Sequence, residues 1–314
     1  MILISAVVCT FNRAQFLTGA LDSLIQQTLN PESYEIVVVD NASTDETPDV
    51  LRVFKEKYPE HNMVLVFEPR QGAAYARNTG LEHARGKYMA CLDDDAQASP
   101  GWLEHAVELF ETVEPTPICV GGPIFPFYVA PKPAWFKDEY EIKTYGSEPL
   151  FLRRGKTFTG PNMVWNTEIA RRLGGFPINL GPKGDYYRMG EETALFASAW
   201  RSLAEPSMYY SPKLSVRHLV TPYQMTVAYR LKWEFVFGQS FQKIYGAQSL
   251  GGRLLFLVKL AWAIVKVGSL ALWRVRSYTC WQNWFVEEWG NVARKLGDLS
   301  GTLGLTILTR RREE

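Results

Sequence analysis

The first hundred residues alternate short apolar, β-branched runs with amphipathic segments, and this alternation constrains the fold more than any other feature. The run at 36–39 contains no polar residue, which is typical of a strand covered on both faces. Between 16 and 25, apolar residues recur at spacings of three and four, which predicts a helix with one apolar stripe. Strands that alternate with helices predict an α/β fold whose mostly parallel sheet is flanked by helices.

The same patterns extend along much of the chain. They predict strands at 4–9, 35–40, 64–67, 87–92, 162–165 and 214–218, and helices at 46–57, 73–84, 167–173 and from 190 onward. Residues 115–155 are rich in proline and aromatic side chains without periodicity, so we expect a loop excursion there. We therefore predict a domain over 1–222, with halves at 1–114 and 115–222, and a helical C-terminal region over 223–314.

Composition excludes some classes of function. Thirty-four Lys and Arg against thirty-three Asp and Glu give a net charge of +1, so no overall basic field recruits nucleic acid. Cys9, Cys91, Cys119 and Cys280 show no CxxC spacing, and three lie in apolar strand-like runs, which indicates reduced core thiols. Residues 1–9 lack a basic leader and a cleavage pattern, so we interpret them as a strand and expect a cytoplasmic protein.

The segment 254–272 is strongly apolar and is interrupted only by Lys259 and Lys266. Two lysines seven residues apart share one helical face, which favours an interfacial or packed helix over a membrane span. One interpretation is a helix lying peripherally on the inner face of the cell membrane, where basic residues contact anionic head groups. The other is a core or dimer helix. The basic residues concerned are Arg253, Lys259, Lys266, Arg274 and Arg276.

Polar residues follow several predicted strands, at the edge where sheets of this type bind ligands. Asp93, Asp94 and Asp95 come directly after an apolar strand, and three adjacent carboxylates repel one another unless a positive group offsets them. Alternate side chains of an extended segment point the same way, so Asp93 and Asp95 can converge on one cation. Hard oxygen ligands suit Mg²⁺ or Mn²⁺. The alternative is an acidic turn that faces solvent or caps the next helix.

Four segments in order resemble family-two glycosyltransferases with the GT-A type of fold. They are 8–13, 37–45, 72–80 and the DxD-like triplet 93–95. The resemblance implies a nucleotide-binding sheet and a metal-dependent, inverting transfer of a sugar from a nucleotide diphosphate sugar to an acceptor hydroxyl. It further implies a glycan or lipid-linked acceptor and a role in cell-surface polysaccharide or glycan biosynthesis. No QxxRW motif is present, so a single addition fits better than polymerisation.

The resemblance also implies roles for residues on the donor side. Asp40 would bind the donor's base, with Thr10, Phe11 and Arg13 lining the same pocket, while Asp45 is expected to cap a helix. Asp93 and Asp94 would lie beside the donor, and Asp93 and Asp95 would hold the metal. Arg77 would contact the diphosphate or the acidic cluster, although it could equally be an exposed helix arginine.

Three further positions carry implied roles on the acceptor side and beside the metal. Glu192 stands where the family usually has an aspartate base, and Glu191 is a possible substitute, although acidic residues favour the first turn of any helix. His218 would contact the metal or the diphosphate, or be structural. Asn162 resembles an acceptor-side element but could also be an ordinary turn asparagine.

Two other classes of function remain open at this level. A sugar nucleotidyltransferase would share the fold, but residues 10–14 lack the Gly-rich, Lys-bearing loop typical of that class. A non-catalytic module that binds glycan or lipid is favoured by the aromatic segment 125–145 and the apolar segment 254–272. The dinucleotide fingerprint GxGxxG after the first strand and the P-loop motif GxxxxGKS/T are both absent, which excludes those two phosphate-binding modes.

Overall fold

A computed structural model describes residues 1–183, 186–205, 207–245, 258, 260–262, 264–265, 267, 275–305, 307 and 309–310. Arg253, Lys259, Lys266 and Arg274 lie outside the described residues, as does much of the helix expected at 254–272. Within the described part, no helix has both the length and the apolar character needed to cross a bilayer.

The chain forms two compact units, which are described separately. Unit 1 contains Met1–Phe127, Glu141–Asn179 and Glu191–Leu219, and unit 2 contains Tyr128–Tyr140, Leu180–Gly190 and Val220–Glu314. The division near residue 220 lies close to the expected one at 222. However, two segments from within the expected first domain, 128–140 and 180–190, belong to unit 2.

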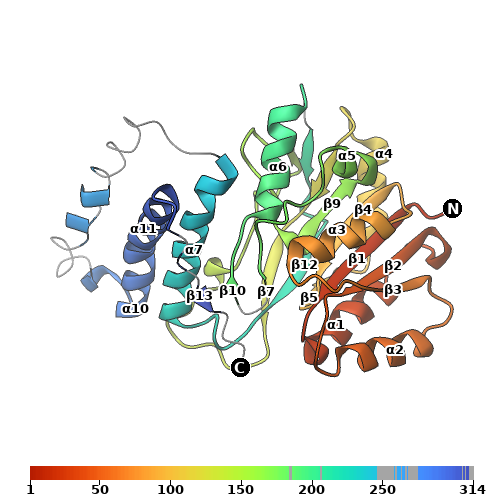
Figure 1. Ribbon diagram of the computed structural model, residues 1–314, viewed down its shortest axis with the longest axis horizontal. Coiled ribbons are helices and arrows are strands. Elements are labelled where there is room, and N and C mark those ends of the chain that lie inside the picture. The colour runs from red at the N-terminus through yellow and green to blue at the C-terminus, as the bar shows by residue number, and fades with distance from the viewer. Residues whose placement is uncertain are drawn as a thin grey trace. The chain divides into compact units, whose positions relative to one another are not determined.

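Unit 1 is built on an eight-stranded sheet in the order β3-β2-β1-β4-β9-β6-β11-β8. The first four are parallel, whereas β9 runs antiparallel to both β4 and β6. The strands are β1 (Ile4–Thr10), β2 (Tyr34–Asp40), β3 (Met63–Phe67), β4 (Tyr88–Asp93), β6 (Cys119–Gly121), β8 (Leu150–Phe151), β9 (Met163–Asn166) and β11 (Met208–Tyr210). This confirms the predicted α/β class with a mostly parallel sheet (Figure 1).

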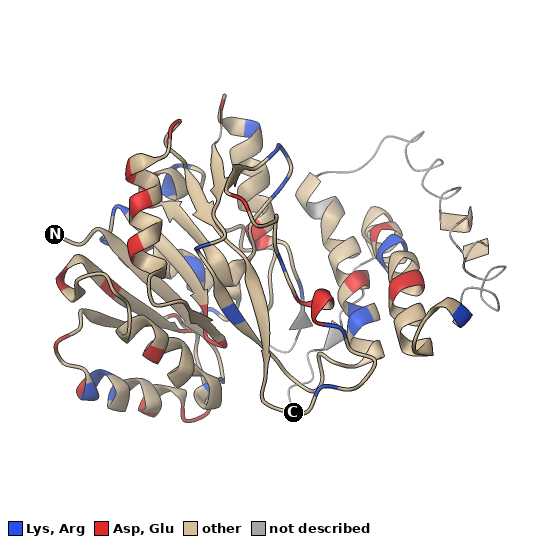
Figure 2. Ribbon diagram, turned by 180° about the vertical axis from the view of Figure 1, so that it is seen from behind, with Lys and Arg blue, Asp and Glu red and all other residues tan. Residues whose placement is uncertain are grey.

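Helices cover both faces of this sheet, as the unbroken apolar strands predicted. Side chains of α1 (Ala14–Ile25), α2 (Thr47–Lys57) and α4 (Trp102–Thr112) pack into one buried cluster. Those of α3 (Ala73–His83), α5 (Thr167–Arg172) and α6 (Glu191–Ser202) pack into another on the opposite face. The strands themselves are mostly uncharged, as their tan colour in Figure 2 shows.

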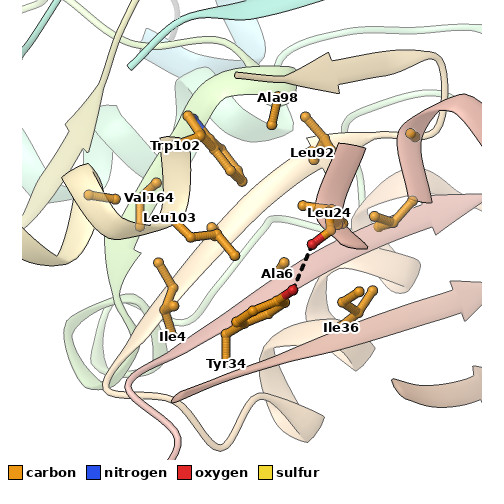
Figure 3. Close-up of a cluster of buried hydrophobic side chains, with 14 of the residues drawn as sticks. Ile4, Ala6, Leu24, Tyr34, Ile36, Leu92, Ala98, Trp102, Leu103 and Val164 are labelled. Carbon is orange, nitrogen blue, oxygen red and sulfur yellow. Dashed lines mark hydrogen bonds between the residues drawn. The ribbon is translucent and has the colours of Figure 1, made fainter. Parts of the chain in front are cut away.

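Hydrogen bonds complete the packing where polar atoms enter the core. Figure 3 shows the buried Tyr34 ring among apolar side chains, with its hydroxyl donating to the Leu24 carbonyl oxygen at 2.8 Å. Cys9, Cys91 and Cys119 lie in strands, and all four cysteines are free thiols, as predicted.

The expectation of a loop excursion over 115–155 was wrong in part. This stretch contributes β6 and β8 to the large sheet, and β7 (Ile124–Tyr128) joins β5 (Ala96–Ala98) and β12 (Val216–Val220) in a second, three-stranded sheet. A three-residue strand such as β6 is too short to show a periodic pattern. Only its partners β9 and β11 identify it as a strand.

In unit 2, α7 (Val227–Tyr245) packs closely against α11 (Gly290–Thr302), and glycine permits the contact. A β-carbon on Gly297 would collide with the Phe235 carbonyl oxygen, and one on Gly238 with the Arg294 carbonyl oxygen. Tyr140 of the expected excursion forms hydrogen bonds with α7 and with the segment that directly precedes α11. Arg230 donates to the Tyr140 carbonyl oxygen at 2.6 Å, and the Tyr140 hydroxyl donates to Glu287 at 2.9 Å.

Asn162 joins three segments of unit 1 from a fully buried position. Its Nδ2 donates to the carbonyl oxygens of Pro123 at 3.0 Å and Leu214 at 2.6 Å, and its Oδ1 accepts from Trp102 Nε1 at 3.0 Å. The turn that contains it, Gly160–Asn162, leads directly into β9. One amide therefore links α4 to the segments that precede β7 and β12 of the small sheet.

We predict that Asn162→Ala lowers the free energy of unfolding by about 2–4 kcal/mol, because it leaves two buried carbonyls and an indole N–H without partners. Thermal and denaturant unfolding of the full chain measure the loss. Asn291→Ala, at an exposed position of α11, is the matched control, and its effect should stay within about 0.5 kcal/mol. Equal stability of Asn162→Ala and wild type would contradict this structural role.

Candidate active site

The carboxyl ends of β1, β2 and β4 lie at one edge of the sheet because the three strands are parallel and in register. Thr10 pairs with Asp40, and Cys9 pairs with Asp93. The chain continues from Asp93 through Asp94 and Asp95 into β5. The acidic triplet therefore begins where ligands bind in sheets of this kind.

Strand β12 brings His218 to the same place. His218 lies opposite Ala96 in the antiparallel β5–β12 pair, and Leu219 N donates to the Asp95 carbonyl oxygen at 2.9 Å. His218 Nε2 lies 3.1 Å from Asp95 Oδ1. As a result, Asp93, Asp95 and His218 each offer one ligand atom, and these atoms lie within 4.8 Å of one another.

This donor set fits a divalent cation. Two carboxylate oxygens and one imidazole nitrogen suit Mn²⁺, and the oxygens suit Mg²⁺, with the remaining coordination positions left for phosphate or water. Burial lowers the pKa of His218, but the charge of Asp95, its hydrogen bond to the imidazole and the charges of Asp93 and Glu141 together outweigh burial and raise that pKa to about 9. Burial also raises the pKa of Asp94 to about 7, against the opposing attraction of Arg13.

Two arginines balance the acidic cluster. Arg13, at the start of α1, places Nη1 3.3 Å from Asp95 Oδ2. Arg77, on α3, places Nη2 3.2 Å from Asp93 Oδ1. Each of the two aspartates expected to hold a metal is therefore paired with a guanidinium.

Arg77 also binds both glutamates at the start of α6. Its Nη1 lies 2.5 Å from Glu191 Oε1, and its Nη2 lies 2.8 Å from Glu192 Oε1. Burial alone would lower the pKa of Arg77, but the carboxylates around it raise that pKa well above its usual value. The sequence left open whether Arg77 is an exposed helix residue, and the structure makes it the buried link between Asp93 and α6.

Glu192 is the more accessible member of the glutamate pair, because its side chain is 20% exposed and that of Glu191 only 5%. Its Oε2 accepts a hydrogen bond from Gly160 N at 2.9 Å. Burial raises the pKa of Glu192 to about 7, although the attraction of Arg77 lowers it. A carboxyl with such a pKa can accept a proton near neutral pH.

Gly160 is a site residue that the sequence did not indicate. A β-carbon at this position would collide with Glu192 Oε1 and lie 2.7 Å from Arg77 Nη2. Only glycine lets the backbone approach closely enough to orient the Glu192 carboxylate. Because GPN also reads as an ordinary turn, no local signal identifies this role.

The loops after β1 and β2 support one another at the expected donor end. Asp40 accepts from Ser43 N at 2.9 Å, and Asn12 accepts from Thr44 N at 2.7 Å. Asn12 has φ +53°, a left-handed conformation that asparagine tolerates. Asp45 accepts from Thr47 N at 3.0 Å and from Ala14 N at 3.3 Å, so it serves the starts of two helices. The Thr10 side chain is buried, and Phe11 is half-buried.

Asn41 is a second residue that the sequence did not single out. Its buried amide donates to the carbonyl oxygens of Glu68 and Arg70 and accepts from Gly72 N at 2.7 Å. It thereby fixes the turn that leads into α3 and hence the start of the helix that carries Arg77. The sequence could have pointed to Asn41 only through its position in the segment 37–45, directly after Asp40 at the end of the strand.

Asn162 is the most deeply buried of the residues expected at the site. Its side chain is fully buried, and both of its polar atoms bond within the protein. This burial and these hydrogen bonds support a structural role for Asn162, and the expected acceptor contact stays a prediction. Charged residues expected there form two groups of ion pairs, one in which Asp95 contacts Arg13 and His218 and one in which Arg77 contacts Asp93, Glu191 and Glu192. The ligand atoms of Asp93, Asp95 and His218 bring the two groups within 4.8 Å of each other.

Two curated proteins that are named as glycosyltransferases are similar in sequence. Glucosyl-dolichyl phosphate glucuronosyltransferase of Haloferax volcanii is 27% identical over 228 residues, which cover 70% of each chain. Glycosyltransferase AglE of the same organism is 28% identical over 185 residues, 59% of each chain.

Solved structures are similar in fold. Mannosyltransferase PcManGT from Pyrobaculum calidifontis, in complex with GDP-Man and Mn²⁺, superposes with a TM-score of 0.66 at 23% identity, over 94% of this chain and 86% of that one. TarS of S. aureus with UDP-GlcNAc superposes with a TM-score of 0.54 at 18% identity, over 80% of this chain and 69% of that one. These likenesses confirm the GT-A type of fold.

The family profile described as "Glycosyl transferase family 2" matches residues 5–171. The match includes the carboxyl ends of β1, β2 and β4, the arginine on α3 and the acidic triplet. Because the profile spans more than half of the chain, the protein belongs to glycosyltransferase family 2.

Proposed function

We propose that this glycosyltransferase is metal-dependent and transfers a sugar, with inversion, from a nucleoside diphosphate sugar to a hydroxyl of a glycan or lipid-linked acceptor. The observation that carries the proposal is the convergence of Asp93, Asp95 and His218 at the strand ends, linked through Arg77 to Glu192. The guanidinium of Arg77 thus joins the proposed diphosphate site, at Asp93, to the proposed proton acceptor, Glu192.

Asp93, Asp95 and His218 are the residues that would hold Mg²⁺ or Mn²⁺. A bound ion would offset the negative charge of the diphosphate leaving group. Asp40 and the loop from Thr10 to Arg13 are proposed to bind the nucleoside, with Asp94 beside the donor. Arg13 pairs with Asp95, and a bound cation would neutralise part of the Asp95 charge. Arg13 could then also contact the donor phosphates.

Glu192 is the proposed base. Its carboxylate accepts the proton of the acceptor hydroxyl as that oxygen forms its bond to the anomeric carbon and the bond to the diphosphate breaks. Gly160 N and Arg77 hold this carboxylate in one orientation. The fold thereby fixes where an acceptor hydroxyl must lie to donate its proton to Glu192. Glu191 is more deeply buried and lies at 2.5 Å from Arg77, so it serves as the fixed partner that keeps Arg77 in place.

The acceptor proposal draws on the name of one relative. The name of the Haloferax volcanii relative states action on a dolichyl phosphate-linked sugar, so a lipid-linked acceptor in glycan or cell-surface polysaccharide biosynthesis is proposed here. A sugar nucleotidyltransferase would share the sheet but release pyrophosphate. A pyrophosphate assay with a sugar phosphate and a nucleoside triphosphate separates the two reactions.

Removal of one proposed metal ligand should abolish both metal binding and transfer. In wild type, Mn²⁺ together with UDP or GDP should raise the melting temperature by several degrees, because a ligand that binds only the folded state stabilises it. We expect Asp95→Asn to lose this metal-dependent rise and to lower transfer by about a hundredfold or more.

The control is Asp49→Asn, which removes an exposed carboxylate from α2. It should retain the metal-dependent rise and the transfer rate of wild type. Unchanged Mn²⁺-dependent stabilisation in a folded Asp95→Asn protein would refute the proposed metal site.

The rate should depend on the protonation of Glu192. Since its folded pKa is raised to about 7, the base is deprotonated above that pH, and kcat should fall about tenfold per unit below it. Glu192→Gln should lower kcat by about 10²–10⁴-fold, with little change in KM for the donor. It should also remove the fall in kcat at low pH, which is the acidic limb of the pH profile. The measurement is the pH profile of kcat at saturating donor and acceptor.

Glu191→Gln is the matched variant on the same turn of α6. It should keep the acidic limb, because Glu192 remains the base, while losing part of the Arg77 ion pair. An acidic limb that survives in Glu192→Gln and disappears in Glu191→Gln would reverse the assignment.

A further inference from the structure

The described helical residues between 258 and 267, in unit 2, are apolar on two opposite sides. Leu260 and Val267 are each 6% exposed and pack in a buried cluster with Val292 of α11. Their positions are seven apart in the sequence, so the two side chains share one face of the helix. This face holds the helix against the rest of unit 2.

The opposite side of this helix is apolar and exposed. Val258 is 59% exposed, and Trp262 and Val265 are each 64% exposed. Together with the exposed Ala261 they follow the spacing i, i+3, i+4, i+7, which places them on one face, away from that of Leu260 and Val267. The two lysines in this stretch of sequence, Lys259 and Lys266, lie outside the described residues. We call Val258, Ala261, Trp262 and Val265 the outer face.

In the sequence, the stretch that contains the outer face carries charges of one sign. All thirty-three acidic residues of the chain lie outside 235–286, whereas six basic residues lie within that segment. They are Lys243, Arg253, Lys259, Lys266, Arg274 and Arg276. The same segment contains four tryptophans, at 262, 273, 281 and 284, a residue type enriched at membrane–water interfaces.

We propose that unit 2 docks on an anionic lipid surface through the outer face. An apolar helix face within a stretch of sequence that is basic and contains several tryptophans matches the boundary between acyl chains and negatively charged head groups. A second copy of the chain matches less well, because two acid-free basic segments would then face each other. Insertion of valine and tryptophan side chains removes exposed apolar surface from water, and each basic residue near the surface adds attraction that salt screens.

This docking goes beyond the proposed transfer reaction and does not depend on it. The metal site lies in unit 1, and the outer face lies in unit 2. Lipid binding can therefore be measured without donor, acceptor or metal, so failure of the docking proposal leaves the transfer proposal standing, and the reverse also holds.

The test is flotation of the full chain with vesicles of phosphatidylcholine alone or mixed with phosphatidylglycerol. Wild type should float with the mixed vesicles at low salt, and both neutral vesicles and high salt should reduce the bound fraction. Val258→Glu combined with Val265→Glu should reduce binding to the mixed vesicles by about tenfold or more, because it places two carboxylates on the inserting face.

Val53→Glu is the matched control, since Val53 is 55% exposed on helix α2 of unit 1. It should bind as wild type does. Thermal unfolding of every variant checks that it is folded. If the double variant unfolds, Val258→Glu alone replaces it. The proposal is overturned if wild type stays at the bottom with anionic vesicles, if the folded outer-face variant floats as wild type does, or if sedimentation shows that the substitutions only dissociate a dimer.

Discussion

The active site depends on one balance of charge. Asp93, Glu191 and Glu192 come from the end of β4 and the start of α6, and the single guanidinium of Arg77 contacts all three. Buried carboxylates repel one another and are costly without a cation, so loss of this guanidinium would leave charges that the fold cannot solvate. The same balance gives Glu192 its raised pKa, because burial outweighs the attraction of Arg77. Charge neutralisation and proton affinity thus have one structural origin.

Uncharged residues position these charged groups. Gly160 brings a backbone N–H to Glu192, and Asn41 fixes the turn before the helix that carries Arg77. Asn162 holds the loops around the small sheet that contains His218. Each supplies hydrogen bonds that backbone groups in loops would otherwise lack. Precise placement of the proposed catalytic carboxylate therefore depends on uncharged neighbours.

Unit 2 adds a different property to the enzyme. Its exposed apolar helix face and acid-free basic segment fit a negatively charged bilayer, and a lipid-linked acceptor would be confined to that bilayer. An enzyme bound to the surface meets such an acceptor at a higher effective concentration than one in solution. The two proposals are thus mutually consistent, although different residues carry them.

The sequence alone determined the α/β class, the long strands and helices, and the acidic triplet at the end of β4, because burial on regular elements leaves a periodic local pattern. Three features were decided by tertiary structure. Strand β6 has three residues and is defined by its neighbours. Asn162 matched both an acceptor contact and a turn in the sequence, and only the folded structure shows that its side chain is buried. Arg77 meets Glu191 across 114 positions of sequence and Glu192 meets Gly160 across 32, and no local pattern records partners that only folding brings together.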